Sequence, residues 1–331
     1  MTLLNEAVQL ALRLGVELPF ERWGGALHPA RSFCLDWDVP FYFSALLPSF
    51  VPAPGHTLSR CLGWWKLEVT APEVPPHFAL WATYPGNNRS PIQDEVSALR
   101  AVGLEGIGLR YRGITDDEFE ALGEWEELRY VALEFCSRAT PGAFERFPLG
   151  LRGLQLADCE QMEFADFHSL ERFPLLSWLS VSEVHASILD VAGRLPALTR
   201  LHASNLAATE ADVAALAGAS QLRFLHLSVR DLGCRALLPL AELPRLRQLE
   251  LDLGRTTNEE LRVLEAFEQL EEIHLNPGLS VRATPTRLVG LAAALPKLRR
   301  LGLQAASRWG WSPAEWEALR AQLPARVQLV E

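Results

Sequence analysis

A repeated spacing of leucines constrains the fold of this chain more than any other feature of its sequence. The block that begins at Leu222 reads Leu-x-x-Leu-x-Leu, and the same pattern begins again 24 residues later at Leu246. Blocks of this kind recur at intervals of 22 to 28 residues, and their first apolar positions are Leu104, Leu128, Leu151, Leu176, Leu198, Leu222, Leu246, Leu270 and Leu298. A period of this length predicts a stack of similar units, each adding one strand to a continuous sheet.

Signals for helices lie between these blocks. Thr115 with Glu118, and Ser312 with Glu315, have the spacing of a capping box, in which hydroxyl and carboxylate accept hydrogen bonds from first-turn amides. Related helix starts are expected at Thr140, Thr209 and Thr257. Prolines stand just before several blocks, where a helix must end, at Pro148, Pro174, Pro196, Pro244 and Pro296. Each unit is therefore predicted to contain a strand, a loop, a helix and a return.

The pattern resembles the leucine-rich-repeat family. Residues 113–119, Gly-Ile-Thr-Asp-Asp-Glu-Phe, are similar to the ribonuclease-inhibitor-like, bacterial-type subclass. The resemblance covers roughly 230 of the 331 residues. It implies an α/β fold, an open solenoid or horseshoe with a parallel sheet on the concave side and helices on the convex side. Residues 96–331 would form this domain, with about 9–10 repeats of ~24 residues, and residues 1–95 an α+β capping region.

The family pattern also places Asn or Cys three positions after the third apolar residue of a block. Cys136 and Cys159 occupy this position, so both are expected to be buried structural residues. Other residue types occupy it elsewhere, namely Arg112, Val184, Leu206, Arg230, Gly254, Gly278 and Ala306. The loops are therefore expected to be less regular than the strands.

The first 95 residues do not follow the repeat. An apolar stripe over residues 3–14 predicts a helix, and residues 64–70 and 77–84 read as strands. Half of the ten tryptophans lie here, at Trp23, Trp37, Trp64, Trp65 and Trp81. Two interpretations are open, because the segment either covers the exposed end of the solenoid core or forms a separate ligand-binding module built on its aromatic residues.

Composition limits the classes of partner. A net charge of −10 argues against nonspecific nucleic-acid binding and against an anionic membrane surface, since both require a basic footprint. The chain shows no signal-peptide pattern and no apolar run of ~18 residues. Its five cysteines include no C-x-x-C pair, which disfavours disulfides and zinc knuckles and indicates a reducing cytoplasm. No cofactor or catalytic motif is present, so we expect a non-enzymatic protein.

The candidate site follows from the alternation of side chains along a strand. The residue between the second and third apolar positions of a block must point away from the core, and these residues form one column on neighbouring strands. Residues two positions before and after it form flanking columns on the same face. The predicted partner-binding residues are Tyr130, Trp178, Arg200, His202, Phe224, His226, Glu250, Asp252, Glu272 and His274.

Three interpretations of this face are open. The first is a non-catalytic scaffold that binds a protein partner, with a basic partner suited to the acidic charge, as in an inhibitor, an immunity protein or an effector. The second is a metal-binding or hydrolytic site built on the column His202, His226, Glu250 and His274. The third is a solvated surface without a single function. Because Glu250 lies between His226 and His274, it should favour their protonated forms, which predicts a pH-sensitive surface.

Overall fold

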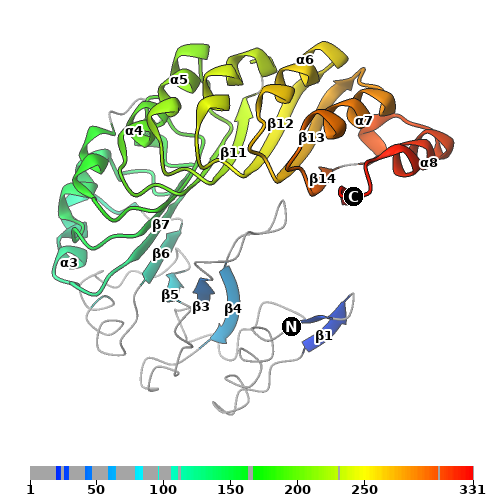
Figure 1. The fold of residues 1–331 in the computed structure, drawn as a ribbon. Helices are drawn as coiled ribbons and strands as arrows, with labels where there is room; N and C mark the ends of the chain where they lie inside the picture. The colour runs from blue at the N-terminus through cyan, green and yellow to red at the C-terminus, as the bar shows by residue number, and fades with distance from the viewer. Residues whose placement is uncertain are drawn as a thin grey trace. The chain divides into compact units, whose positions relative to one another are not determined.

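The computed structural model describes the chain in two compact units, residues 1–151 and 152–331 (Figure 1). In the first it describes residue 96, residues 106–110 and 113–151, and the strands β1 (Phe20–Trp23), β2 (Ala26–Pro29), β3 (Tyr42–Leu46), β4 (Ser59–Trp64) and β5 (Ala79–Tyr84). In the second it describes residues 152–162, 167–229, 232–304 and 306–330. Side chains are described only beyond residue 95. The helix predicted over residues 3–14 and the boundary expected near residue 95 lie outside these ranges.

The first unit contains antiparallel strands followed by the first strands of the repeat. β1 pairs with β2, and β3 pairs with both β4 and β5, all antiparallel. β5 then pairs in parallel with β6 (Gly106–Arg110), which pairs in parallel with β7 (Tyr130–Glu134). β5 confirms the strand expected within residues 77–84. β4 ends at the first residue of the other expected strand, whose remaining residues are not described.

The second unit contains eight parallel strands in chain order, an arrangement that confirms the predicted open leucine-rich-repeat solenoid. Leu201 is the Cα partner of Leu225, and Leu225 of Leu249, so the register follows the 24-residue period. Figure 1 shows these strands along the inner side of the arc of this unit. The strands are β8 (Gly153–Ala157), β9 (Trp178–Ser182), β10 (Arg200–Ser204), β11 (Phe224–Val229), β12 (Gln248–Thr256), β13 (Glu272–Val281), β14 (Arg300–Leu303) and β15 (Gln328–Val330).

Short helices lie along the outer side of the second unit (Figure 1). Its α-helices are α4 (Ile188–Arg194), α5 (Glu210–Ala215), α6 (Asn258–Val263), α7 (Pro285–Ala294) and α8 (Pro313–Gln322). Its 3₁₀ helices are η3 (Glu160–Met162), η4 (His168–Arg172), η5 (Leu216–Gly218), η6 (Cys234–Glu242), η7 (Leu264–Ala266) and η8 (Ala306–Trp309). No helix in the described ranges is long and apolar enough to cross a lipid bilayer.

The first unit also carries helices after its repeat strands, namely η1 (Asp116–Phe119), α3 (Glu120–Gly123) and η2 (Pro141–Arg146). A repeat of about 24 residues leaves few residues for a helix once the strand and turns are formed. The helical segments are accordingly short, and several are 3₁₀ helices only. The ribonuclease-inhibitor-like subclass therefore stays a prediction.

The predicted capping boxes are confirmed. The backbone amide of Thr115 donates to Glu118 Oε2 at 2.9 Å, and that of Ser312 donates to Glu315 Oε2 at 2.8 Å. Thr209 forms a third box with Asp212, which confirms that helix start as well. A cap of this kind is worth ~1 kcal/mol, which matters for helices of only one or two turns.

The apolar residues of the blocks form the core between the sheet and the helices. Leu225, Leu227 and Leu249 are fully buried, as are Leu198 and Leu222. Each leucine removed from water in this way stabilises the fold by roughly 1.5–3 kcal/mol. The alternation along the strands is thereby confirmed, because the residues between these leucines must lie on the opposite face of the sheet.

The repeats share one turn geometry directly after β7 to β10, whereas β12 and β13 differ. Residues directly after β7, β8, β9 and β10 have a left-handed backbone, with φ between 52° and 55°, and these are Phe135, Asp158, Glu183 and Asn205. Cys136 and Cys159 follow the first two and are buried, and their thiols donate to the carbonyls of Leu109 and Ala157. Both cysteines are therefore structural, as predicted. β12 and β13 instead run on for 9 and 10 residues.

Three tryptophans pack together near the C-terminal end of the second unit. The ring centroids of Trp309 and Trp311 lie 4.9 Å apart, and those of Trp311 and Trp316 lie 5.0 Å apart. Trp309 is buried, and its indole N–H donates to the carbonyl of Gln304 at 3.1 Å. This cluster fixes η8 beside β14.

Candidate functional site

The central column of the candidate site lies in register across β10 to β14. His202, His226, Glu250, His274 and Gly302 are successive Cα partners on these neighbouring strands. The leucines on either side of each residue are buried in the core, so the column lies on the inner face of the sheet. The juxtaposition predicted from the 24-residue spacing is confirmed.

His226 is the centre of a charged network on this face. Its Nδ1 lies 3.2 Å from Oε2 of Glu250, and its Nε2 lies 3.4 Å from Oδ2 of Asp252. Only 13% of its side chain is exposed. Burial lowers the pKa of His226, but the hydrogen bonds and charges of Asp252 and Glu250 outweigh this effect and raise the pKa to about 9. His226 is therefore an imidazolium that donates from both nitrogens at neutral pH.

His202 stands beside this cation and has the opposite character. The ring centroids of His202 and His226 lie 4.0 Å apart with 34° between the ring planes, and Oγ of Ser180 lies 3.4 Å from Nδ1 of His202. Burial and the charge of His226 lower the pKa of His202 to about 4, although Asp252 acts slightly the other way. His202 is therefore neutral, and His226 charged, between about pH 4 and pH 9.

Two further charged groups lie beside the column on β13 and β14. Oε2 of Glu272 lies 3.9 Å from Nε2 of His274, and Oε1 of Glu272 accepts a hydrogen bond from Nη1 of Arg300 at 3.0 Å. The hydrogen bond with His274 and the charge of Arg300 lower the pKa of Glu272, in spite of burial. The imidazole of His274 lies over Gly302, where a Cβ atom would be 1.9 Å from its Nδ1.

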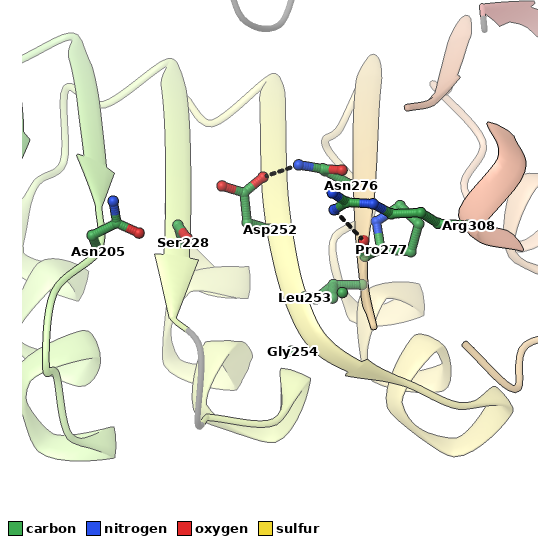
Figure 2. Close-up of a pocket in the computed structure, with 9 residues that line it drawn as sticks. Asn205, Ser228, Asp252, Leu253, Gly254, Asn276, Pro277 and Arg308 are labelled. Carbon is green, nitrogen blue, oxygen red and sulfur yellow. Dashed lines mark hydrogen bonds between the residues drawn. The ribbon is translucent and has the colours of Figure 1, made fainter. Parts of the chain in front are cut away.

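Asp252 connects the network to a pocket of about 400 Å³ (Figure 2). Its Oδ1 accepts a hydrogen bond from Nδ2 of Asn276 at 2.9 Å. Burial raises the pKa of Asp252, but hydrogen bonds with His226, Asn276 and Ser228 and the charge of His226 lower it further than burial raises it. The carboxylate therefore stays ionised, and a third of its side chain remains exposed.

The remaining predicted residues differ in how much surface they offer. Trp178 and Arg200 are half-buried neighbours in the flanking column on β9 and β10. Phe224 is the next residue in that column, but it is only 5% exposed. Tyr130 is 8% exposed and belongs to the first unit, whereas the other predicted residues belong to the second.

The pocket also includes residues outside the predicted partner-binding set. Asn205 follows β10, Pro277 lies in β13, and Arg308 lies on η8 between β14 and α8. None of the three lies on a predicted inward-facing column. The sequence contains no signal that would place Arg308 beside Asp252, because the connection after β14 does not follow the repeat.

The geometry does not support the metal interpretation of the column. A metal ligand must present a free lone pair on nitrogen, whereas both nitrogens of His226 are engaged by carboxylates and the ring holds its proton. Within the described parts of the chain, no group of three or more His, Cys, Asp or Glu residues is arranged to hold a metal ion. Glu250 favours the protonated form of His226, as expected, because it helps to raise the pKa of that ring to about 9, whereas the pKa of His202 is lowered to about 4. The pH-sensitive surface itself stays a prediction.

Comparisons with known proteins find a likeness only among solved structures. A scan of protein-family models and a search of curated proteins gave no match. An internalin (InlF) from Listeria monocytogenes is 16% identical with a TM-score of 0.40, and the match covers 71% of this chain and 72% of that one. Internalin C2 from the same organism is 17% identical with a TM-score of 0.41, and the match covers 59% and 80%.

A third similar structure is that of a TLR13–ssRNA13 complex. It is 14% identical with a TM-score of 0.39, and the match covers 63% of this chain and 33% of that one. At these identities the likeness concerns the fold alone.

Proposed function

We propose that this protein is a non-catalytic interaction scaffold that binds a protein partner through the inner sheet face of β9 to β13. The observation that carries the proposal is the network of His226, Glu250 and Asp252 on that face. Placing three charged groups where they are largely removed from water destabilises a fold relative to a well-packed apolar surface. The helices of this unit cover the other face of the sheet, so the network is not a by-product of core packing. Binding of a partner accounts for the presence of this charged network on the inner face of the sheet.

The charges of the site favour a basic partner. His226 carries one positive charge between two carboxylates, so the network has a net charge of about −1. The whole chain has a net charge of −10, which steers basic molecules toward it. Trp178 and Arg200 lie beside the network and are half-buried, and these residue types are the most common anchors of protein interfaces.

A reducing compartment such as the cytoplasm belongs to the same proposal. The cysteines whose side chains the structure describes are buried, and they are Cys136, Cys159 and Cys234. Buried thiols persist most readily where the surroundings keep cysteine reduced.

Affinity capture from the native lysate tests the face assignment. We expect Trp178→Ala and Arg200→Gln each to weaken capture of the partner by about tenfold or more, as interface anchors do. Arg235→Gln is the matched control, because Arg235 is exposed on the outer helix η6. Phe224→Ala is not a useful variant, since truncating a buried phenylalanine costs about 3–5 kcal/mol of stability and would confuse folding with binding. Equal capture by all three variants, each with a native circular dichroism spectrum, contradicts the proposal.

A further inference from the structure

The pocket beside Asp252 has two walls of opposite charge. It lies along β10 to β13, and Arg308 of η8 extends to it from one side (Figure 2). Its volume of about 400 Å³ falls within the range typical of pockets for small ligands. Asp252 forms one wall, Arg308 the other, and the amide of Asn276 lies between them.

The wall at Asp252 is anionic and keeps a hydrogen-bond acceptor position available to a ligand. Its carboxylate accepts from Asn276 at 2.9 Å, lies 3.4 Å from Nε2 of His226, and also bonds to Ser228. A carboxylate offers about four acceptor positions, so roughly one remains for a ligand. The positive charge of His226 is shared with Glu250, which leaves this side of the pocket with net negative charge.

The wall at Arg308 is cationic and keeps N–H donors available for hydrogen bonds to a ligand. Nη1 of Arg308 donates to the carbonyl of Pro277 at 3.5 Å, and among the described residues Arg308 forms no ion pair. A guanidinium has five N–H donors, so most of them are available. The neighbouring Trp309 holds η8 in place through its buried ring and its hydrogen bond to Gln304. Arg308 is thus an exposed cation on a helix, η8, whose position is fixed by packing.

We propose that this pocket binds a basic amino acid that has a free carboxylate, such as lysine or arginine, either as the free molecule or as the last residue of a polypeptide. The side-chain cation pairs with Asp252, and the carboxylate pairs with Arg308, which recognises it through a two-pronged hydrogen bond. Asp252 and Arg308 belong to different elements, β12 and η8, so a ligand that pairs with both needs two groups of opposite charge. The inference goes beyond protein binding by the sheet face, although both involve Asp252.

Isothermal titration calorimetry with matched small probes tests the proposal on the full chain. Lysine is compared with norleucine, which lacks the side-chain cation, and with cadaverine, which lacks the carboxylate. We expect lysine to bind about tenfold or more tightly than either, because each loses a hydrogen bond between charged groups. Lysine that binds no more tightly than norleucine or cadaverine, or that gives no binding at millimolar concentration, overturns the proposal.

Two variants assign the effect to the two walls. Asp252→Asn should abolish the preference for lysine over norleucine, and Arg308→Gln should abolish the preference for lysine over cadaverine. The matched controls are Glu317→Gln and Arg320→Gln, which change the same charges on the outward side of α8. Arg308 is exposed, so its variant keeps the test valid even if Asp252→Asn unfolds. Loss of both preferences in the control variants contradicts the assignment.

A third comparison distinguishes the two sources of the ligand. The tripeptide Gly-Gly-Lys with a free carboxylate binds only if the pocket accepts the end of a polypeptide, and its C-terminal amide should bind about tenfold more weakly. Binding of lysine alone assigns the pocket to the free amino acid. Because these probes do not require the protein partner, the pocket proposal and the scaffold proposal fail independently.

Discussion

The imidazole ring of His202 stacks on that of His226, with the ring centroids 4.0 Å apart. Two imidazolium ions at this distance would repel each other, so only one of the two rings readily becomes an imidazolium. That ring is His226, because Glu250 and Asp252 lie at its two nitrogens, whereas His202 faces the hydroxyl of Ser180. Throughout the physiological pH range His226 is therefore cationic and His202 neutral, although both belong to one column.

The first prediction concerns the titration of these two rings. We expect His226 to titrate with a pKa of about 9 and His202 with a pKa of about 4, as measured by NMR of the imidazole protons and nitrogens. In the variant Asp252→Asn the pKa of His226 should fall, because one of its two carboxylate partners is removed. Titration of both rings near their ordinary value of ~6.5 shows that the network does not form.

The second prediction follows from the sign of these shifts. The pKa of His226 is raised on folding, so its contribution is fully present below ~6.5 and is lost as pH rises toward about 9. His226→Gln should therefore lower the free energy of unfolding by on the order of 3 kcal/mol at pH 6 and by much less at pH 9.5. Urea denaturation at the two pH values measures this.

His202 supplies the control with the opposite sign. Its pKa is lowered on folding, so it destabilises the fold as pH falls from ~6.5 toward about 4. His202→Gln should therefore gain stability relative to the wild-type chain over that interval. Equal pH dependence of the His226 and His202 variants is incompatible with the stacked arrangement.

The third prediction compares two glycines. A Cβ at Gly302 would lie 1.9 Å from Nδ1 of the largely buried His274, so Gly302→Ala should destabilise the fold by roughly 1–3 kcal/mol. Gly290 lies inside α7, where a Cβ would meet only Nη1 of Arg287 at 3.8 Å. Gly290→Ala should be neutral or stabilise by up to about 1 kcal/mol. Thermal denaturation of both variants decides whether His274 lies over Gly302.

The fourth prediction concerns cysteine reactivity. Burial raises the pKa of Cys234 to about 12, with the charge of Glu260 acting in the same direction, and Cys136 and Cys159 are also buried. Because the thiolate is the reactive species, all three should resist alkylation by iodoacetamide in the native protein and react in 8 M urea. Peptide mass spectrometry reads each site separately. Rapid native labelling of any of the three contradicts its place in the core.

The 24-residue period was enough to predict the strands, their register and the column of the candidate site. The reason is geometric, because equal spacing in a parallel stack places equivalent residues side by side, as with Leu201 and Leu225. The capping boxes were predictable as well, since the side chains of Thr209 and Asp212 accept hydrogen bonds from each other's backbone amides, only three residues apart. Both kinds of information are local or strictly periodic.

The tertiary structure decided what the site residues do. His202 and His226 occupy equivalent positions, and only the packing of Asp252 and Glu250 around one of them separates their pKa values. Phe224 and Trp178 share a flanking column, yet packing leaves one buried and the other half-exposed. Arg308 reaches the pocket through a connection outside the repeat. Charge state, exposure and pocket shape depend on contacts between side chains in three dimensions, and a periodic sequence pattern does not encode those contacts.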